Sequence, residues 1–279
     1  MQPADVKAVD LVAFETFRGL FPLVDESLEE RSRRARGRIA HLLETDPGGA
    51  WVARRGDGRV IGAALALLRD DVWGLSLLVV EPTAQSGGVG RELLARALDY
   101  GAGARGGLIL SSTDARALRA YARAGFSLRP MAGAAGIVDR RAIPPRHPDI
   151  EEHGLEAAPV VEWISRAIRG ATYARDLPPI LDSGYRLLTL ADRGFALHKA
   201  GRVRVLAALD EETARALLWA GLAEGPPGAT VDLEHIGPGQ DWAVEVALEA
   251  RLDLSITGAL FVRGELGPLH PYLPSGAYL

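Results

Sequence analysis

The sequence contains no cysteine among its 279 residues, which excludes disulfides, thiolate nucleophiles and zinc sites built on thiolates. It also lacks an apolar run near the ~20 residues that a membrane-spanning helix requires. Asp5, Lys7 and Asp10 interrupt the N-terminal stretch where a signal sequence would need an apolar core. These absences predict a soluble, cytoplasmic protein with no membrane partner.

An excess of positive charge is missing as well. The chain has 32 Lys and Arg against 36 Asp and Glu, a formal net charge of −4. The one strongly basic stretch, EERSRRARGR at 29–38, reads as a helix, so nucleic acid is not an expected partner. His147 and His153 have metal-like spacing, but they lie in a proline-rich connector without a rigid scaffold. No metal site is expected.

The length and composition predict a globular chain of two domains. Hydrophobic residues make up 48% and charged residues 24% of the sequence, which is typical of folded proteins. The segment DRRAIPPRHPDIEEHG, residues 139–154, carries three prolines and no apolar periodicity, so it is interpreted as a linker. The predicted domains are residues 1–138 and 155–279.

Hydrophobic patterning predicts the same order of elements in both halves. In the first half, helices over 10–21 and 26–44 precede two strands around a Gly-Asp-Gly turn and a third strand, WGLSLLVVEP. A helix, a strand, a second helix and a final strand near 126–131 follow. The second half repeats this order with little residue identity, so a divergent duplication is a hypothesis. The expected class is α+β, with mixed sheets flanked by helices in two tandem domains.

One glycine-rich turn is a candidate anion site. In LVVEPTAQSGGVGRELL, residues 78–94, a strand stops at Pro82, and Gly87, Gly88 and Gly90 lead into a helix. Free backbone N–H groups at a positive helix end suit a phosphate or pyrophosphate, although an ordinary strand-to-helix turn is the alternative. GAGARG, residues 101–106, also fits Gly-x-Gly-x-x-Gly, but it follows a helix and precedes a strand, the reverse of a dinucleotide site.

Two segments together resemble the GNAT superfamily of N-acetyltransferases. The segment at 78–94 resembles the acyl-coenzyme A motif of that superfamily, and STDARALRAYARAGF resembles its downstream segment through Asp114, Tyr121, Gly125 and Phe126. The resemblance covers about residues 5 to 135. It extends to the second half only in the order of elements, although tandem GNAT proteins with a degenerate second copy are known.

The resemblance implies acetyl-CoA as cosubstrate and no metal. The pantetheine arm would lie as an added strand on main-chain groups of Leu78 and Val80, and N–H groups near Val79 and Val80 would polarise the thioester carbonyl. The pyrophosphate would bind the turn, with Arg91 adding a charge contact. The remaining implied contacts are Gln85, Ser86, Gly87, Gly88, Val89, Gly90, Asp114, Ala117 and Tyr121.

The resemblance also implies direct transfer of acetyl to a primary amine of a small molecule or peptide. Tyr121 would protonate the departing thiolate; the alternative is an aromatic packing residue. The third strand, WGLSLL, has no acid, so the candidate bases are Glu81, Asp70 and Asp71, each of which alternatively is a solvated strand-end residue. If there is no base, an amine that arrives neutral attacks unaided.

The second half departs from the motif. Asp210, Glu211 and Glu212 replace the glycines, and its last helix has no tyrosine, so this half is predicted to be a non-catalytic copy that covers the substrate cleft or forms a homodimer surface. The acceptor pocket could be lined by Phe14, Phe17 and Phe21, whose helical spacing equally suits a core. Two rival functions stay open: a CoA-binding module without turnover, and a protein-interaction module.

Overall fold

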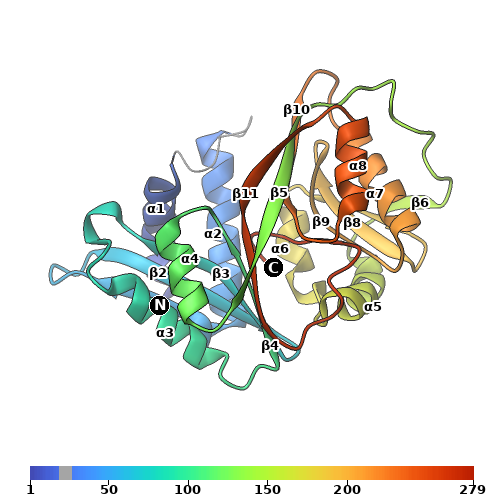
Figure 1. The fold of residues 1–279 in the computed structure, drawn as a ribbon. Coiled ribbons are helices and arrows are strands. Elements are labelled where there is room, and N and C mark those ends of the chain that lie inside the picture. The colour runs from blue at the N-terminus through green and yellow to red at the C-terminus, as the bar shows by residue number, and fades with distance from the viewer. Residues whose placement is uncertain (19–26) are drawn as a thin grey trace. The chain divides into compact units, whose positions relative to one another are not determined.

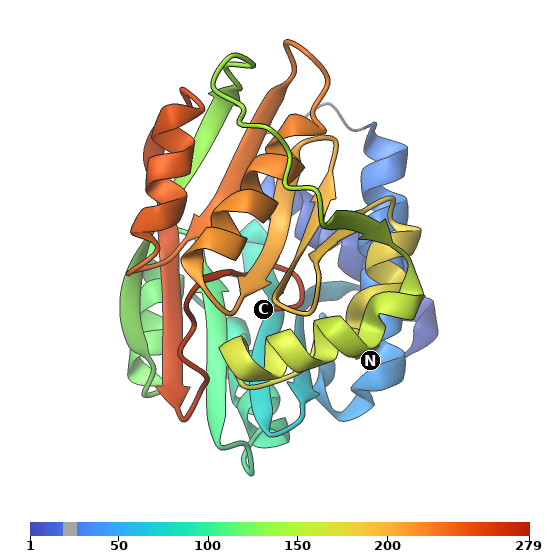
Figure 2. The same ribbon diagram turned by 90° about the vertical axis from the view of Figure 1, so that its right-hand side faces the viewer.

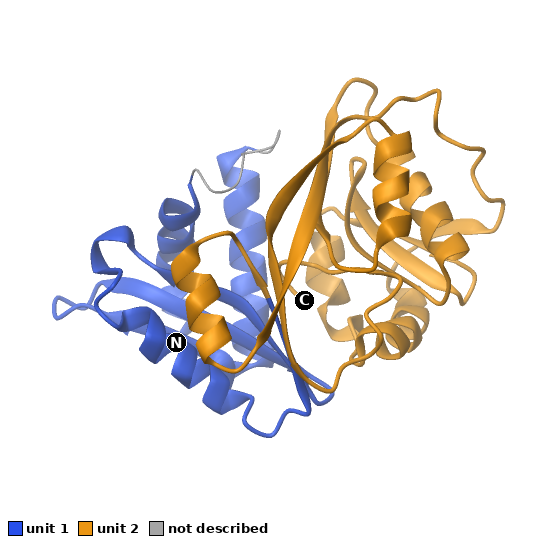
Figure 3. Ribbon diagram, in the orientation of Figure 1, with its two compact units in different colours: residues 1–109, 279 blue, residues 110–278 orange. Residues whose placement is uncertain are grey.

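The computed structural model describes residues 1–18 and 27–279, which form the helices and strands of Figure 1. The chain divides into two compact units, Met1–Ile109 with Leu279, and Leu110–Tyr278 (Figure 3). The elements up to the end of the first unit are α1 (Val6–Phe17), α2 (Leu28–Thr45), β1 (Ala50–Arg54), β2 (Val60–Arg69), β3 (Val72–Val80), α3 (Val89–Tyr100) and β4 (Gly106–Ser111). The elements of the second unit are α4 (Ala115–Arg123), β5 (Ser127–Ile137), β6 (Ile150–His153), α5 (Ala158–Arg169), α6 (Leu177–Asp182), β7 (Arg186–Leu190), β8 (Gly194–Lys199), β9 (Arg202–Ala208), α7 (Glu211–Ala223), β10 (Thr230–Ile236), α8 (Asp241–Glu249), β11 (Asp253–Gly264) and β12 (Tyr272–Leu273).

The sheet of the first unit is mixed. β1 pairs antiparallel with β2, β2 antiparallel with β3, and β3 parallel with β4. Apolar side chains of α1 and α2 pack with alternate residues of β2 and β3 to form one core cluster. The other face of β2 meets α3, where Gly62 lies against Leu93. Helices therefore flank both faces of this sheet.

Local sequence patterns predicted most elements of the first unit correctly. The Gly-Asp-Gly hairpin is confirmed: Arg55 donates its N–H to the Arg59 carbonyl at 2.9 Å, and Gly58 adopts φ +88°. The first helix begins at Val6 rather than at residue 10, because a 3-10 turn that opens on Pro3 starts it early. Its predicted end at residue 21 lies outside the described residues.

Gly101 shows why GAGARG contains glycine. A Cβ on this residue would lie 2.1 Å from Cδ1 of Trp73, whose indole N–H donates to the Ala97 carbonyl at 2.9 Å. Glycine is needed here because the buried indole passes against the end of α3. The motif match at 101–106 therefore has a packing explanation.

The second unit contains two sheet portions. Strands β11, β5 and β10 are antiparallel neighbours, and β12-β9-β8-β7-β6 form a five-stranded antiparallel sheet. Figure 2 shows α7, in orange, lying over β8 and β9, the strands that it contacts. β5 comes from the first predicted domain, yet it pairs with β10 and β11 of the second predicted domain. Because β5 pairs with these strands, it belongs to the second compact unit, and the units divide between Ile109 and Leu110.

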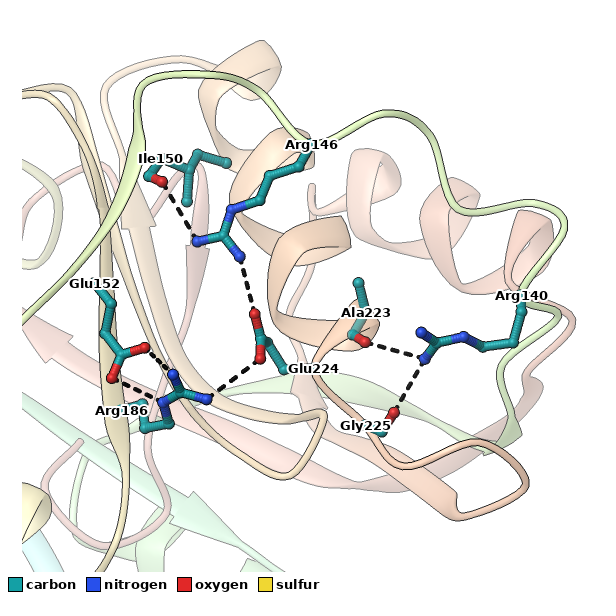
Figure 4. Close-up of polar contacts among 8 residues, drawn as sticks. All are labelled: Arg140, Arg146, Ile150, Glu152, Arg186, Ala223, Glu224 and Gly225. Carbon is teal, nitrogen blue, oxygen red and sulfur yellow. Dashed lines mark hydrogen bonds and ion pairs between the residues drawn. The ribbon is translucent and has the colours of Figure 1, made fainter.

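The predicted linker, residues 139–154, is firmly attached to the second unit and contains β6 (Figure 4). Arg140 donates to the Ala223 and Gly225 carbonyls at 3.0 Å, which satisfies the end of α7. Arg146 pairs with Glu224 at 2.9 Å. The two compact units divide between Ile109 and Leu110 and not in this segment, so the domain boundary at 139–154 stays a prediction.

The predicted element order of the second half is present as α5, β7, β8, β9, α7, β10, α8 and β11, and the α+β class is confirmed. Three short elements were not predicted: β6 and α6, both near prolines, and β12, which pairs with β9 through Tyr272 and Leu273. No helix within the described ranges combines the length and the apolar character that a membrane span requires.

Candidate active site

β3 presents main-chain groups on the side away from β2. Glu81 donates its N–H to the Ile61 carbonyl at 2.8 Å, so the register makes Leu77 and Val79 hydrogen-bond with β2 as well. The N–H and C=O groups of Leu78 and Val80 consequently point to the other side. There β4 pairs with Val72–Leu75 alone. We call Ser76–Val80 the open edge of β3.

The register sharpens which groups of the open edge can bind a ligand. Val79 lies opposite Ala63 in a hydrogen-bonded pair, so its N–H faces β2 and not the open side. The Val80 carbonyl accepts from Thr16 Oγ1 at 3.3 Å and from Gln85 Nε2 at 2.9 Å. The Leu78 N–H and C=O and the Val80 N–H remain for an added strand. The Val79 N–H therefore does not point to the open side, and the cosubstrate contact of Val79 stays a prediction.

The glycine turn has the geometry of an anion site. After a 3-10 turn at Pro82–Ala84, Ser86 adopts φ +65° and Gly88 φ +90°, and Gly88 is the N-cap of α3. The first hydrogen bond of the helix is donated by Glu92 to the Gly88 carbonyl at 3.1 Å. Among the described residues, none accepts from the N–H groups of residues 86–91. These donors are those predicted for the pyrophosphate.

Two side chains complete the turn. An ideal Cβ on Gly88 would lie 3.6 Å from Nη2 of Arg91, so the guanidinium stands beside the turn. Arg91 is exposed, as are Ser86 and Gly87, so an anion can reach the turn from solvent. Gln85 fastens the turn to the end of β3 through the Val80 carbonyl. Sequence reasoning missed Thr16, which reaches the same carbonyl from α1 and carries no motif.

Glu81, the predicted base, is held by cations. Its carboxylate, on a side chain that is 10% exposed, pairs with Arg59 at 2.9 Å and Arg55 at 2.5 Å, and it accepts from Thr83 Oγ1 at 2.7 Å. The Thr83 hydrogen bond, followed by the two guanidinium charges, lowers the pKa of Glu81. A carboxylate with a lowered pKa is a weaker proton acceptor. These contacts favour a structural role, and the assignment as base stays a prediction.

Glu81→Gln separates the two roles. We expect a lower melting temperature at neutral pH and a change in kcat below ~10-fold, because a base would contribute about 10²–10⁴-fold. Because the pKa of folded Glu81 is lowered, its stabilisation is present at neutral pH and is lost as the pH falls through that lowered value. Melting curves of both proteins should therefore converge in acid.

Glu92→Gln is the matched control, since Glu92 is an exposed residue of α3 that pairs with Arg96. It should leave the melting temperature nearly unchanged. A 10²–10⁴-fold loss of kcat in Glu81→Gln, with no change in melting temperature, would establish Glu81 as the base instead.

Tyr121 lies on α4, in the second unit. Its ring is 6% exposed and meets Phe261 of β11 edge to face, with centroids 5.4 Å apart. Burial, followed by the nearby Asp114 carboxylate, raises the pKa of the Tyr121 phenol above its usual range. The phenol therefore stays protonated at neutral pH. In the described part of the chain, no group hydrogen-bonds to its hydroxyl, so the proton is free for a ligand.

Asp114 and Ala117 share the face of α4 that carries Tyr121. Asp114 is the N-cap of the helix: it accepts from the Arg116 N–H at 2.8 Å and pairs with the Arg116 guanidinium, the contact that most lowers the pKa of Asp114. Ala117 is half-buried. The contacts predicted for both residues with the cosubstrate stay predictions.

The remaining candidates are two aspartates and three phenylalanines. Asp70 and Asp71 form the turn between β2 and β3, at the opposite end of β3 from the glycines. Phe17 packs against the core cluster of the first unit, while Phe14 lies under the Arg31 guanidinium at 4.6 Å. Phe21 lies outside the described residues.

The matching place in the second half is already occupied by a carboxylate. Asp210 is the N-cap of α7; it accepts from the Thr213 N–H at 2.9 Å and pairs with Arg193 at 2.7 Å. Glu211 and Glu212 follow in the first turn, where negative charge stabilises a helix. The Asp210 carboxylate therefore already caps the N-terminus of α7, and the negative charge there would repel a pyrophosphate.

Comparisons with known proteins find a similar family and similar folds. Residues 13–126 match the model of the acetyltransferase (GNAT) family. This segment contains β3, the glycine turn and α4. No curated protein matches the sequence.

Solved structures extend the likeness to the fold of the whole chain. An acetyltransferase candidate from Pyrococcus horikoshii has a TM-score of 0.80 at 17% identity, over 100% of this chain and 94% of that chain. A GCN5-related N-acetyltransferase from Sphaerobacter thermophilus gives 0.56 at 17% identity, over 95% and 94%. A tandem GNAT protein from the clavulanic acid biosynthesis pathway gives 0.55 at 15% identity, over 93% and 95%. The predicted GNAT-like fold is confirmed.

Proposed function

We propose that this protein is an N-acetyltransferase that transfers acetyl from acetyl-CoA to a primary amine of a small molecule or peptide. The observation that carries the proposal is the continuity of the open edge of β3 with the free N–H groups of residues 86–91. The first suits an added strand and the second suits a pyrophosphate, and one cosubstrate contains both parts.

The reaction is a direct displacement. The amine nitrogen attacks the thioester carbonyl carbon, and the carbonyl oxygen takes the negative charge, which an outward main-chain N–H of the open edge stabilises. The C–S bond then breaks as the C–N bond is kept. The thiolate takes the Tyr121 hydroxyl proton, and the attacking nitrogen gives up its extra proton to a base or to water. The products are an amide and free coenzyme A.

We further propose that the second half is a degenerate, non-catalytic copy of the GNAT fold. The carboxylate of Asp210 caps α7 where a phosphate would have to bind, which supports a single CoA site per chain. The similarity of the whole chain to a tandem GNAT protein supports the duplication.

The absence of cysteine makes the test of turnover direct. A thiol-reactive dye can report only released coenzyme A, because the protein has no thiol of its own. With acetyl-CoA and a panel of primary amines, free thiol should appear in equal amount to acetylated amine, which mass spectrometry measures. Thiol release without acetylated amine, or no release with any amine, would contradict the proposal.

A second candidate function is a CoA-binding module without turnover. The arginine contacts of Glu81 favour it, because they make the acid that directly follows β3 a weaker base. Calorimetric binding of acetyl-CoA without thiol release across the amine panel would support this candidate.

A further inference from the structure

Leu279 fills the space over Gly74 of β3. Both residues belong to the first unit, and Leu279 is 1% exposed. An ideal Cβ on Gly74 would lie 2.3 Å from Cδ1 of Leu279 and 3.4 Å from Cδ1 of Leu67. No side chain fits at residue 74 while Leu279 is in place. Leu279 thus supplies the apolar group that Gly74 lacks.

This contact lies beside the inner end of the open edge. Pairing between β3 and β4 runs through Val72–Leu75, and the register with β2 shifts between Leu65 and Ala66, which makes Ser76 an extra residue in β3. From Val80, next to the glycine turn, to Gly74 the strand spans about 20 Å. An arm that starts at the turn and follows the open edge therefore brings its far end toward Gly74.

We propose that Leu279 determines acyl-chain length, by closing the space at the inner end of the open edge so that an acetyl group fits and longer chains do not. The inference rests on the proposed function, because it assumes that coenzyme A lies along this edge. The occupant is a short acyl thioester, since the group that faces it is an aliphatic side chain with no polar atom.

Binding of unacylated, acetylated and butyrylated coenzyme A by calorimetry tests the inference without requiring turnover. Wild-type protein should bind acetyl-CoA at least ~10-fold more tightly than butyryl-CoA, since a misfit methylene in a closed pocket costs about 10-fold or more. In Leu279→Ala this ratio should fall below ~3-fold, because loss of the isopropyl group makes room for the longer chain. Leu279→Met, close in volume, should keep the wild-type ratio.

A second substitution at Gly74, on the strand that faces Leu279, gives an independent test. In the double variant Gly74→Ala/Leu279→Ala, the new methyl group occupies part of the vacated space, so the acetyl preference should return to within ~3-fold of wild type. If Leu279→Ala melts below the assay temperature, Leu279→Val takes its place, with a shift in the same direction.

An unchanged ratio in Leu279→Ala, or a double variant that discriminates no better than the single one, would overturn the inference. These results differ from a failure of the proposed function. If unacylated coenzyme A does not bind the wild-type protein, the CoA site itself is refuted; if it binds while the acyl ratio ignores Leu279, only the role of Leu279 is refuted.

Discussion

Tyr121→Phe is expected to lower kcat by about 10²–10⁴-fold while the affinity for acetyl-CoA changes little. The substitution removes one hydroxyl from a ring that is held by burial and by Phe261, so the packing is kept. What is lost is the proton for the departing thiolate. Single-turnover measurements of acetylated product isolate this step from product release.

Burial and Asp114 raise the pKa of Tyr121, so the phenol remains protonated between pH 6 and 9. Over this range the wild-type rate should show no alkaline decline caused by Tyr121. Tyr173→Phe is a matched control, because it removes the hydroxyl of another buried tyrosine, which bonds to Tyr272. It should reduce stability but not kcat. A Tyr121→Phe protein with wild-type kcat would remove Tyr121 from the mechanism.

Gly88→Glu is expected to weaken acetyl-CoA binding by about 100-fold or more. Gly88 adopts φ +90°, which a glutamate adopts only with strain. The new carboxylate would also stand beside Arg91 and repel the pyrophosphate. Both effects act on the donors of residues 86–91. Calorimetry of wild type and variant measures the loss.

Gly103→Glu controls for this substitution. Gly103 belongs to the Gly-x-Gly-x-x-Gly match at 101–106, and a Cβ there would meet nothing within 4 Å. Its charge is therefore added to open surface, and acetyl-CoA affinity should stay within ~2-fold of wild type. Equal losses in the two variants, or no loss in Gly88→Glu, would show that the turn does not hold the cosubstrate.

Sequence signals were sufficient where structure is local. The strand, glycine turn and helix at 78–94 and the hairpin at Gly58 each depend on neighbouring residues, so pattern and turn chemistry found them. The α+β class followed from the order of these elements. The same reasoning identified Asp210 as an obstacle to phosphate, and the structure adds that it caps α7.

Long-range partners could not be read from the sequence. β5 pairs with β10 and β11, strands of the other predicted domain, and no local signal specifies that pairing. The predicted linker was interpreted from its prolines, yet arginines attach it to α7. The short helix α6 contains two prolines in its first turn, a position that tolerates them.

The candidate site shows the same limit. The turn donors were predicted, but the direction of each β3 carbonyl and N–H depends on the register with β2, which assigns Leu78 and Val80 outward and Val79 inward. Arg55 and Arg59 reach Glu81 from the hairpin, 26 and 22 residues away. The sequence around Glu81 alone therefore does not predict these ion pairs.

The central claim is that one acetyl-CoA lies along the open edge of β3 with its pyrophosphate on residues 86–91. A crystal structure of the wild-type chain at saturating coenzyme A tests this most directly. We expect phosphate oxygens within hydrogen-bond distance of the turn N–H groups, and the arm paired with Leu78 and Val80. A ligand bound at the N-terminus of α7 instead, or a turn left without phosphate while coenzyme A binds elsewhere, would contradict the account.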